Sequence, residues 1–220
     1  MKKKYCDFIK KSIKQIECYS PWPLFYPWRM SKNEKKIFDI TIKKSKKYLE
    51  FGSGGSTIRA LQKSKAKIYS VDSSKDWIKF MRKYLFIRYF ERKRLNFFHI
   101  NIGPTKEWGV PVDDSLKHLY PQFSSKIFEI LNTENLDTFL VDGRFRVACV
   151  LSTIIYIHTS GNYKKIIIIH DFWNREYYHI VMQYLRVINK VETLGVFSIK
   201  EDLNITEVKQ NYEKYKFDAR

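Results

Sequence analysis

Short apolar runs that end in a glycine, an acid or a small polar residue recur through the middle of the chain. Five of them stand at residues 48–51, 67–71, 97–102, 138–141 and 166–169. Such nearly continuous apolar segments are typical of strands that are buried on both faces of a parallel sheet. The stretches between them carry apolar residues at helical spacing, as Trp77, Phe80, Met81 and Leu85 do within residues 76–92. The alternation of strand and helix predicts a doubly wound α/β sheet.

The N-terminal part departs from this pattern. Residues 1–30 are basic and aromatic, and three prolines within residues 21–27 exclude a regular helix there. We expect this segment to form an irregular strap over the domain. Ser31 and Glu34 then have the spacing of a capping box, which predicts a helix from Ser31 into Lys47.

The C-terminal part has a pattern that differs from that of the central strands and helices. A stretch rich in Tyr, Val and Leu predicts a helix over about residues 176–187. Two short apolar runs around Gly195, within residues 191–199, predict a terminal hairpin. No linker or repeat divides residues 31–220, so we expect a single domain there.

The composition is that of a folded protein. Of the 220 residues, 44% are hydrophobic and 16% are aromatic, which excludes a disordered chain. No apolar run reaches the roughly 18–20 residues of a membrane span, and the N-terminal lysines do not fit a signal peptide. Cys6, Cys18 and Cys149 lack CxxC spacing and cannot all pair within one chain, which favours a reducing compartment. We therefore expect a soluble, cytoplasmic domain of enzyme size.

The net charge of +18 is large enough to attract phosphates or an anionic membrane surface. Of the 41 basic residues, however, 30 are lysine and only 11 are arginine. Arginine is the residue that pairs best with phosphates and bases, because its planar fork donates two parallel hydrogen bonds. We interpret the excess chiefly as a solvated surface, with binding of an anionic substrate as the alternative.

A glycine-rich loop follows the first predicted strand. Residues 50–57 read EFGSGGST, and a helix is expected to begin near Ser56. Glycines there permit positive φ and let a ligand approach the backbone closely. Asp72 lies 20 residues beyond Gly52 at the end of the second strand, where a carboxylate can accept both hydroxyls of a ribose. Together these features predict a site for an adenosine-containing cofactor at the carboxyl edge of the sheet.

Details of the loop distinguish between cofactors. Thr57 stands where the dinucleotide fingerprint has its third glycine, and Glu50 would repel a pyrophosphate but suits a ligand with an ammonium and a sulfonium group. Over roughly residues 31–200 the chain resembles the class I S-adenosylmethionine-dependent methyltransferases, whose first motif runs acid-x-Gly-x-Gly. The segments LEFGSGGST, IGPTKEWG and VDGRFRVAC are also similar to a subgroup of small bacterial and viral methyltransferase-like proteins. The resemblance implies a Rossmann-like, mostly parallel seven-stranded sheet with a C-terminal antiparallel hairpin strand.

The same resemblance implies S-adenosyl-L-methionine as the cofactor and a set of contacts to it. By position, the acid and the glycines of the loop would hold the methionine part, and Ser56 and Thr57 would donate from the helix start. The acid and the serine that follow the second strand would bind the ribose. Asn101 would contact the adenine at the end of the third strand, or would only form a turn there. The implied contacts are Glu50, Gly52, Ser53, Gly54, Ser56, Thr57, Asp72, Ser73 and Asn101.

Methyl transfer to a hydroxyl requires alignment of the two partners and usually a base. Two strand ends supply candidates, namely Asp142 with Arg144 and Arg146, and His170 with Asp171. We expect both strand ends to meet in the crevice that the glycine loop enters. The ordinary pKa of His, about 6.5, suits His170 to general-base chemistry at neutral pH. The alternatives are that His170 only forms a hydrogen bond across the sheet end and that Asp142 only forms a turn. Asp142 and Asp171 could hold Mg²⁺, but no third acid stands at a clear spacing, so a metal is not expected.

The methyl acceptor is the least defined part of this prediction. Residues 103–137 form a long connection that contains Trp108 and could wall a pocket together with the aromatic strap. Aromatic rings beside charged residues suit a sugar, so we expect O-methylation of a small-molecule or glycan acceptor. A nucleic-acid (RNA or DNA) methyltransferase is the alternative that the charge favours, although the fourth strand lacks the (Asp/Asn)-Pro-Pro-(Tyr/Phe) motif of amino-methylating enzymes. A non-catalytic cofactor-binding partner subunit is the third hypothesis.

Overall fold

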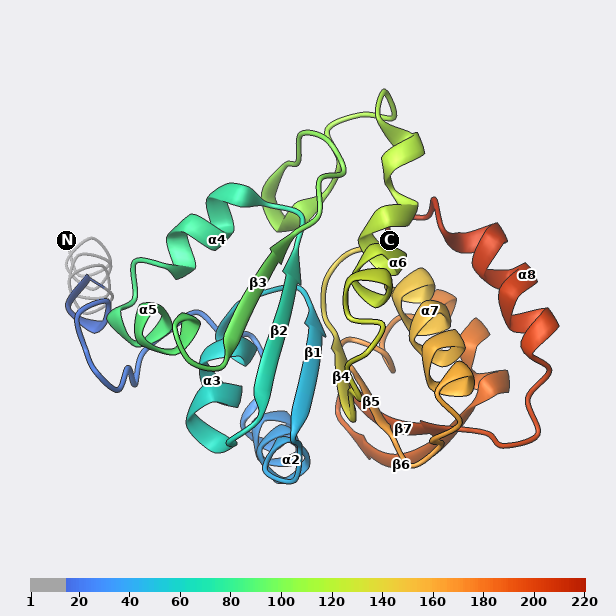
Figure 1. The fold of residues 1–220 in the computed structure, drawn as a ribbon, viewed down its shortest axis with the longest axis horizontal. Helices are drawn as coiled ribbons and strands as arrows, with labels where there is room; N and C mark the ends of the chain where they lie inside the picture. The colour runs from blue at the N-terminus through green and yellow to red at the C-terminus, as the bar shows by residue number, and fades with distance from the viewer. Residues whose placement is uncertain (1–14) are drawn as a thin grey trace.

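A computed structural model of the chain describes residues 15–220 as one seven-stranded sheet with helices on both faces (Figure 1). The strands are β1 (Lys47–Phe51), β2 (Lys67–Asp72), β3 (Leu95–His99), β4 (Thr138–Val141), β5 (Ile166–Ile169), β6 (Leu185–Val191) and β7 (Leu194–Ile199). Their order is β3-β2-β1-β4-β5-β7-β6. Strands β1 to β5 pair in parallel, β7 pairs antiparallel with β5, and β6 pairs antiparallel with β7. The predicted fold class is confirmed, and the chain reverses its direction of winding between β1 and β4.

Two helical layers cover the sheet because alternate residues of each buried strand point to opposite faces. Leu49 and Phe51 of β1 face a core shared with α6, α7 and α8, whereas Tyr48 faces a core shared with α2, α3 and α5. The α-helices are α2 (Lys32–Ile42), α3 (Gly55–Lys63), α4 (Lys75–Met81), α5 (Leu85–Glu91), α6 (Pro121–Ile130), α7 (Arg146–Thr159) and α8 (Ile205–Tyr215). Short 3-10 helices lie at η1 (Glu107–Gly109), η2 (Lys117–Leu119) and η3 (Glu176–Tyr184).

The predicted capping box begins α2. The Ser31 hydroxyl accepts from the Glu34 backbone N–H at 3.2 Å, and the Glu34 carboxylate accepts from the Ser31 N–H at 2.8 Å. The helix ends at Ile42 rather than continuing to Lys47, because Lys47 is the first residue of β1. Its start is therefore as predicted and its end is five residues early.

Two predicted helices are wrong in part. The stretch 76–92 divides into α4 and α5, and a turn at residues 82–84 lets Tyr84 enter the core. The predicted helix over 176–187 is a 3-10 helix that ends at Tyr184, and its last residues belong to strand β6. The hairpin therefore begins earlier than predicted and turns at Glu192–Thr193. Gly195 lies inside β7, where a Cβ would come within 2.3 Å of the Phe197 ring.

The described part of the N-terminal segment, residues 15–30, lies along α3 and α5. The Leu85 N–H donates to the Cys18 carbonyl at 2.7 Å, and the Gln62 amide donates to the Pro23 carbonyl at 2.7 Å. Residues 1–14, which include Cys6 and the first half of the expected strap, lie outside the described residues. Within residues 15–220, every helix is too short or too polar to cross a bilayer.

Candidate functional site

The loop between β1 and α3 reaches the carboxyl edge of the sheet at the point where the strand order reverses. Gly52 has a φ of 98°, and a Cβ there would lie 2.9 Å from the backbone nitrogen of Gly143, so glycine lets the loop pack against the chain after β4. A Cβ at Gly54 would meet no atom within 4 Å. The loop is therefore packed on one side and open at Gly54, where a ligand can approach the backbone.

Glu50 lies beneath this loop and is fully buried. Its carboxylate accepts hydrogen bonds from the hydroxyls of Tyr48 at 3.0 Å, Ser56 at 2.8 Å and Ser70 at 2.7 Å, and from the Thr57 hydroxyl. Burial raises the pKa of Glu50 to about 7, against hydrogen bonds that lower it. The hydroxyls of Ser56 and Thr57 face Glu50, and the expected donation from these two residues to a ligand stays a prediction. Glu50 therefore holds the loop from below, and its expected contact with the methionine part of a cofactor stays a prediction.

Asp72 joins the end of β2 to the glycine loop. Its carboxylate accepts from the backbone N–H of Ser53 at 3.0 Å and of Ser74 at 2.8 Å. Burial raises the pKa of Asp72, although these hydrogen bonds oppose the shift. Each carboxylate oxygen retains a second acceptor position, so Asp72 can still accept from a hydroxyl of a ligand. The neighbouring Ser73 is buried, and its carbonyl lies 3.1 Å from Nε2 of His99.

Asn101 lies beyond the end of β3, which stops at His99. Its side chain is exposed, and its amide oxygen accepts from the backbone N–H of Gly103 at 3.1 Å. The structure thus gives Asn101 a turn-closing hydrogen bond. The expected contact with adenine stays a prediction.

The long connection after β3 returns to the carboxyl edge through Trp108. The Trp108 carbonyl accepts from Nε of Arg144 at 3.0 Å, and the guanidinium of Arg29 lies 4.6 Å from the centre of the Trp108 ring. A Cβ at Gly109 would lie 3.2 Å from Oγ of Ser73. This loop therefore connects the strap, the end of β2 and the end of β4.

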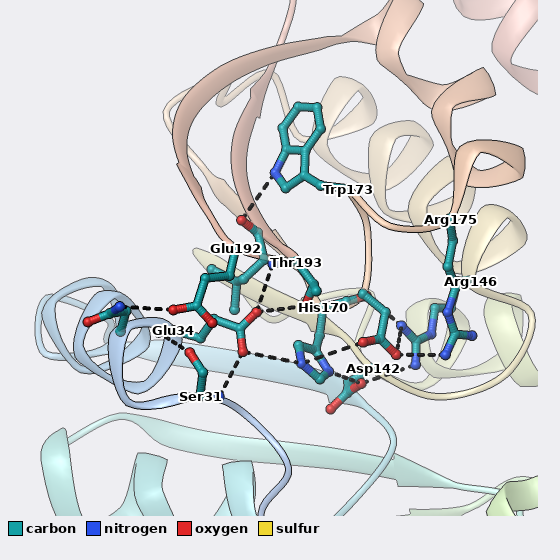
Figure 2. A network of polar contacts seen from close by, with 12 residues as sticks. Ser31, Glu34, Asp142, Arg146, His170, Trp173, Arg175, Glu192 and Thr193 are labelled. Carbon is teal, nitrogen blue, oxygen red and sulfur yellow. Dashed lines mark hydrogen bonds and ion pairs between the residues drawn. The ribbon is translucent and has the colours of Figure 1, made fainter.

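His170 follows β5 and carries a hydrogen bond to the residue that follows β4 (Figure 2). Its Nδ1 lies 2.9 Å from Oδ1 of Asp142, and its Nε2 lies 3.7 Å from Oε2 of Glu34 and 3.8 Å from Oδ1 of Asp171. Burial alone would lower the pKa of His170, but the hydrogen bond to Asp142 and the charges of both aspartates raise it. The sequence prediction that these strand ends meet is confirmed in geometry.

Two arginines neutralise the aspartates of this cluster. Arg146 lies 3.2 Å from Asp142 and 3.4 Å from Asp171, and it also donates to the His170 carbonyl. Arg175 lies 2.8 Å from Asp171. Asp142 and Asp171 therefore hold arginine side chains, and among residues 15–220 no group of three or more His, Cys, Asp or Glu side chains is arranged to hold a metal.

Glu34 is a further part of this cluster, and its sequence position does not indicate this role. Its Oε1 accepts from the backbone N–H of Thr193 at 3.0 Å and from the Thr193 hydroxyl at 2.6 Å, while Oε2 faces His170. Burial would raise the pKa of Glu34, but the hydrogen bonds from Thr193 and Ser31 and the nearby His170 lower it. Only the capping box marked Glu34 in the sequence, because its partner in the β6–β7 turn is 159 residues away.

A surface cavity of about 550 Å³ opens beside His170. Its lining joins the strap, the start of α2, the end of β5 and the β6–β7 turn, and it includes Trp28, Arg29, Glu34, His170, Asp171 and Thr193. An acceptor molecule could enter here within reach of the imidazole.

The fold has known counterparts. The chain is similar to a methyltransferase-like protein from Silicibacter pomeroyi, with a TM-score of 0.73 and 23% sequence identity over 89% of this chain and 98% of that chain. A precorrin-6y C5,15-methyltransferase from Geobacter metallireducens matches with a TM-score of 0.46 and 10% identity, over 83% of this chain and 99% of that chain. At these sequence identities, the similarity to the two proteins is a similarity of fold. No protein-family model and no curated protein matches the chain.

Proposed function

We propose that this protein is an S-adenosylmethionine-dependent methyltransferase that methylates a hydroxyl group of a small or sugar-like acceptor. The observation that carries the proposal is the His170–Asp142 pair, which stands at the edge of the sheet that also carries the open glycine loop. In open α/β sheets this edge, at the reversal of strand order, is where ligands bind. The fold shared with a methyltransferase-like protein supports the same activity.

The residues of the glycine loop fit S-adenosylmethionine. Gly54 leaves space against the backbone, and Asp72 has acceptor positions for ribose hydroxyls beside it. The cofactor, when bound, supplies an electrophilic methyl group. The protein supplies alignment of the acceptor and removal of its proton.

His170 is the proposed base. We assign the Nδ1–H as the donor to Asp142, which leaves Nε2 to accept the proton of the acceptor hydroxyl. The resulting imidazolium is stabilised by Asp142, Glu34 and Asp171, while Arg146 limits the negative charge around it. Asp142 and Arg146 are thus positioning residues, and Arg144 positions the Trp108 loop.

The cavity beside His170 favours a neutral, hydroxyl-rich acceptor. Glu34 and Glu192 give its wall two carboxylates against the single guanidinium of Arg29, a balance that disfavours a phosphate backbone. Trp28 adds part of an aromatic side chain to the lining. These features support a sugar-like acceptor over a nucleic acid.

Transfer of a labelled methyl group from S-adenosylmethionine to a panel of sugars, sugar nucleotides and RNA oligonucleotides tests the proposal. We expect label on a sugar hydroxyl, and a loss of roughly 10²–10⁴ in turnover for His170→Ala with binding of S-adenosylhomocysteine retained. His158→Ala, at the far end of α7, is the matched control and should keep full turnover. Label on RNA bases, or full activity of His170→Ala, would contradict the proposed role.

A further inference from the structure

Seven large apolar side chains are exposed together where the strap lies on α5, outside the candidate site. They are between 42% and 75% exposed. We refer to them as the strap–α5 surface, and they are Ile16, Tyr19, Trp22, Leu24, Phe25, Leu85 and Tyr89. A soluble monomer seldom gathers so many exposed apolar groups without a binding role for them.

The strap and α5 hold this surface together by direct contacts. The Leu85 N–H donates to the Cys18 carbonyl at 2.7 Å, and the Trp22 ring packs edge-on against Phe86 at 5.4 Å between ring centres. Figure 1 shows the strap and α5 at the same end of the molecule, opposite α8. The apolar groups therefore belong to one region of the surface.

Basic side chains surround these apolar groups. Residues 79–94, which include α5, contain seven Lys or Arg and one Glu. Lys83, Arg88, Arg92 and Lys93 are exposed, and none of them forms an ion pair with another residue of the range 15–220. The surface thus combines exposed hydrocarbon with unneutralised positive charge.

We propose that the strap–α5 surface docks on an anionic lipid membrane. Such binding combines insertion of apolar side chains at the headgroup boundary with attraction of Lys and Arg to acidic lipids. Nucleic acid would also attract the charge and could stack on the aromatic rings. Nucleic acid would not bind Ile16, Leu24 and Leu85, because bases stack on aromatic rings and aliphatic side chains have no π face. A lipid surface uses both kinds of group.

Co-sedimentation of the full chain with phosphatidylcholine vesicles, prepared with and without phosphatidylserine, tests this assignment. At a salt concentration of about 0.15 M we expect binding only to the vesicles with phosphatidylserine. Leu24→Ser with Phe25→Ser should weaken that binding at least about tenfold because it removes the inserted hydrocarbon. Arg88→Glu with Arg92→Glu should weaken it by a similar factor or more, since each basic residue near an anionic surface contributes roughly fivefold.

Two matched variants control for unspecific effects. Ile188→Ser removes an exposed apolar group from β6, and Lys209→Glu with Lys214→Glu reverses two charges on α8. Both should bind as the unchanged protein does, and thermal melts should show all variants folded. Equal binding to both kinds of vesicle, or unchanged binding by the Leu24 and Phe25 variant, would overturn the assignment. So would tighter binding to a single-stranded RNA oligonucleotide than to phosphatidylserine vesicles at the same salt concentration.

Discussion

At the scale of single residues, Glu50 makes the stability of the fold depend on pH. Its pKa is about 7 in the folded chain, against an ordinary 4.5, so the folded state binds the proton more tightly than the unfolded state. The contribution of Glu50 to the free energy of unfolding is then fully present below about 4.5 and falls as the pH rises to about 7. Since one pKa unit corresponds to about 1.4 kcal/mol, the fall amounts to about 3 kcal/mol.

We expect Glu50→Gln to remove most of this fall, because an amide has no charge to bury and the surrounding hydroxyls can still bond to it. Urea denaturation at pH values on either side of the interval measures the effect. Ser20→Ala, at a half-buried position in the strap, should keep the pH dependence of the unchanged protein. An equal slope in Glu50→Gln and the unchanged protein would show that Glu50 does not titrate there.

The proposed role of His170 as a base predicts how the activity depends on pH. Because only the neutral ring can accept a proton, kcat/KM should rise with pH through a midpoint above the ordinary 6.5 of His. Asp142→Asn removes the carboxylate that raises this pKa, so the midpoint should move to lower pH. Asp171→Asn should move it less, because that carboxylate is 3.8 Å from the ring whereas Asp142 is 2.9 Å away. A pH profile that Asp142→Asn leaves in place would remove His170 from the role of base.

At the scale of elements, the strap is fitted to the start of α3. A Cβ at Gly55 would come within 2.3 Å of Cβ of Trp28 and 2.4 Å of the Pro27 carbonyl. Gly55→Ala should therefore displace the strap and lower the free energy of unfolding by about 1–3 kcal/mol, as overpacking does. Faster proteolysis within residues 20–30 would accompany it. Gly54→Ala, where a Cβ meets open space, should leave the strap protected, and equal cleavage of the two variants would contradict this packing.

The elements also show which structure a sequence pattern can predict. The central strands and the start of α2 were predicted because their signals are local, namely buried apolar runs and the Ser31–Glu34 capping box. The start of β6, residues 185–187, was predicted as helix because its strand conformation depends on pairing with β7. Among site residues, the meeting of Asp142 and His170 followed from parallel strand ends. The inward turn of the Ser56 and Thr57 hydroxyls did not, because only the fold shows that Glu50 is buried beneath them.

At the scale of the whole molecule, charge is unevenly distributed. The net charge is +18, yet carboxylates line the cavity beside His170. We therefore expect RNA of mixed sequence to bind weakly, outside that cavity, with an affinity that falls steeply with salt as counterion release requires. Fluorescence anisotropy over a salt series measures this. Nanomolar, sequence-selective binding at physiological salt would favour a nucleic-acid substrate instead.

Isothermal titration calorimetry with S-adenosylhomocysteine and with NAD tests the proposed cofactor most directly. We predict binding of S-adenosylhomocysteine at one site per chain, because the open Gly54 backbone and the Asp72 carboxylate lie together at the loop. NAD should not compete, because Thr57 stands where the dinucleotide fingerprint has its third glycine. Asp72→Ala should weaken that binding by about 1.5–3 kcal/mol, the usual contribution of hydrogen bonds to a charged group. Tight binding of NAD with no binding of S-adenosylhomocysteine would contradict the proposed cofactor and therefore the proposed function.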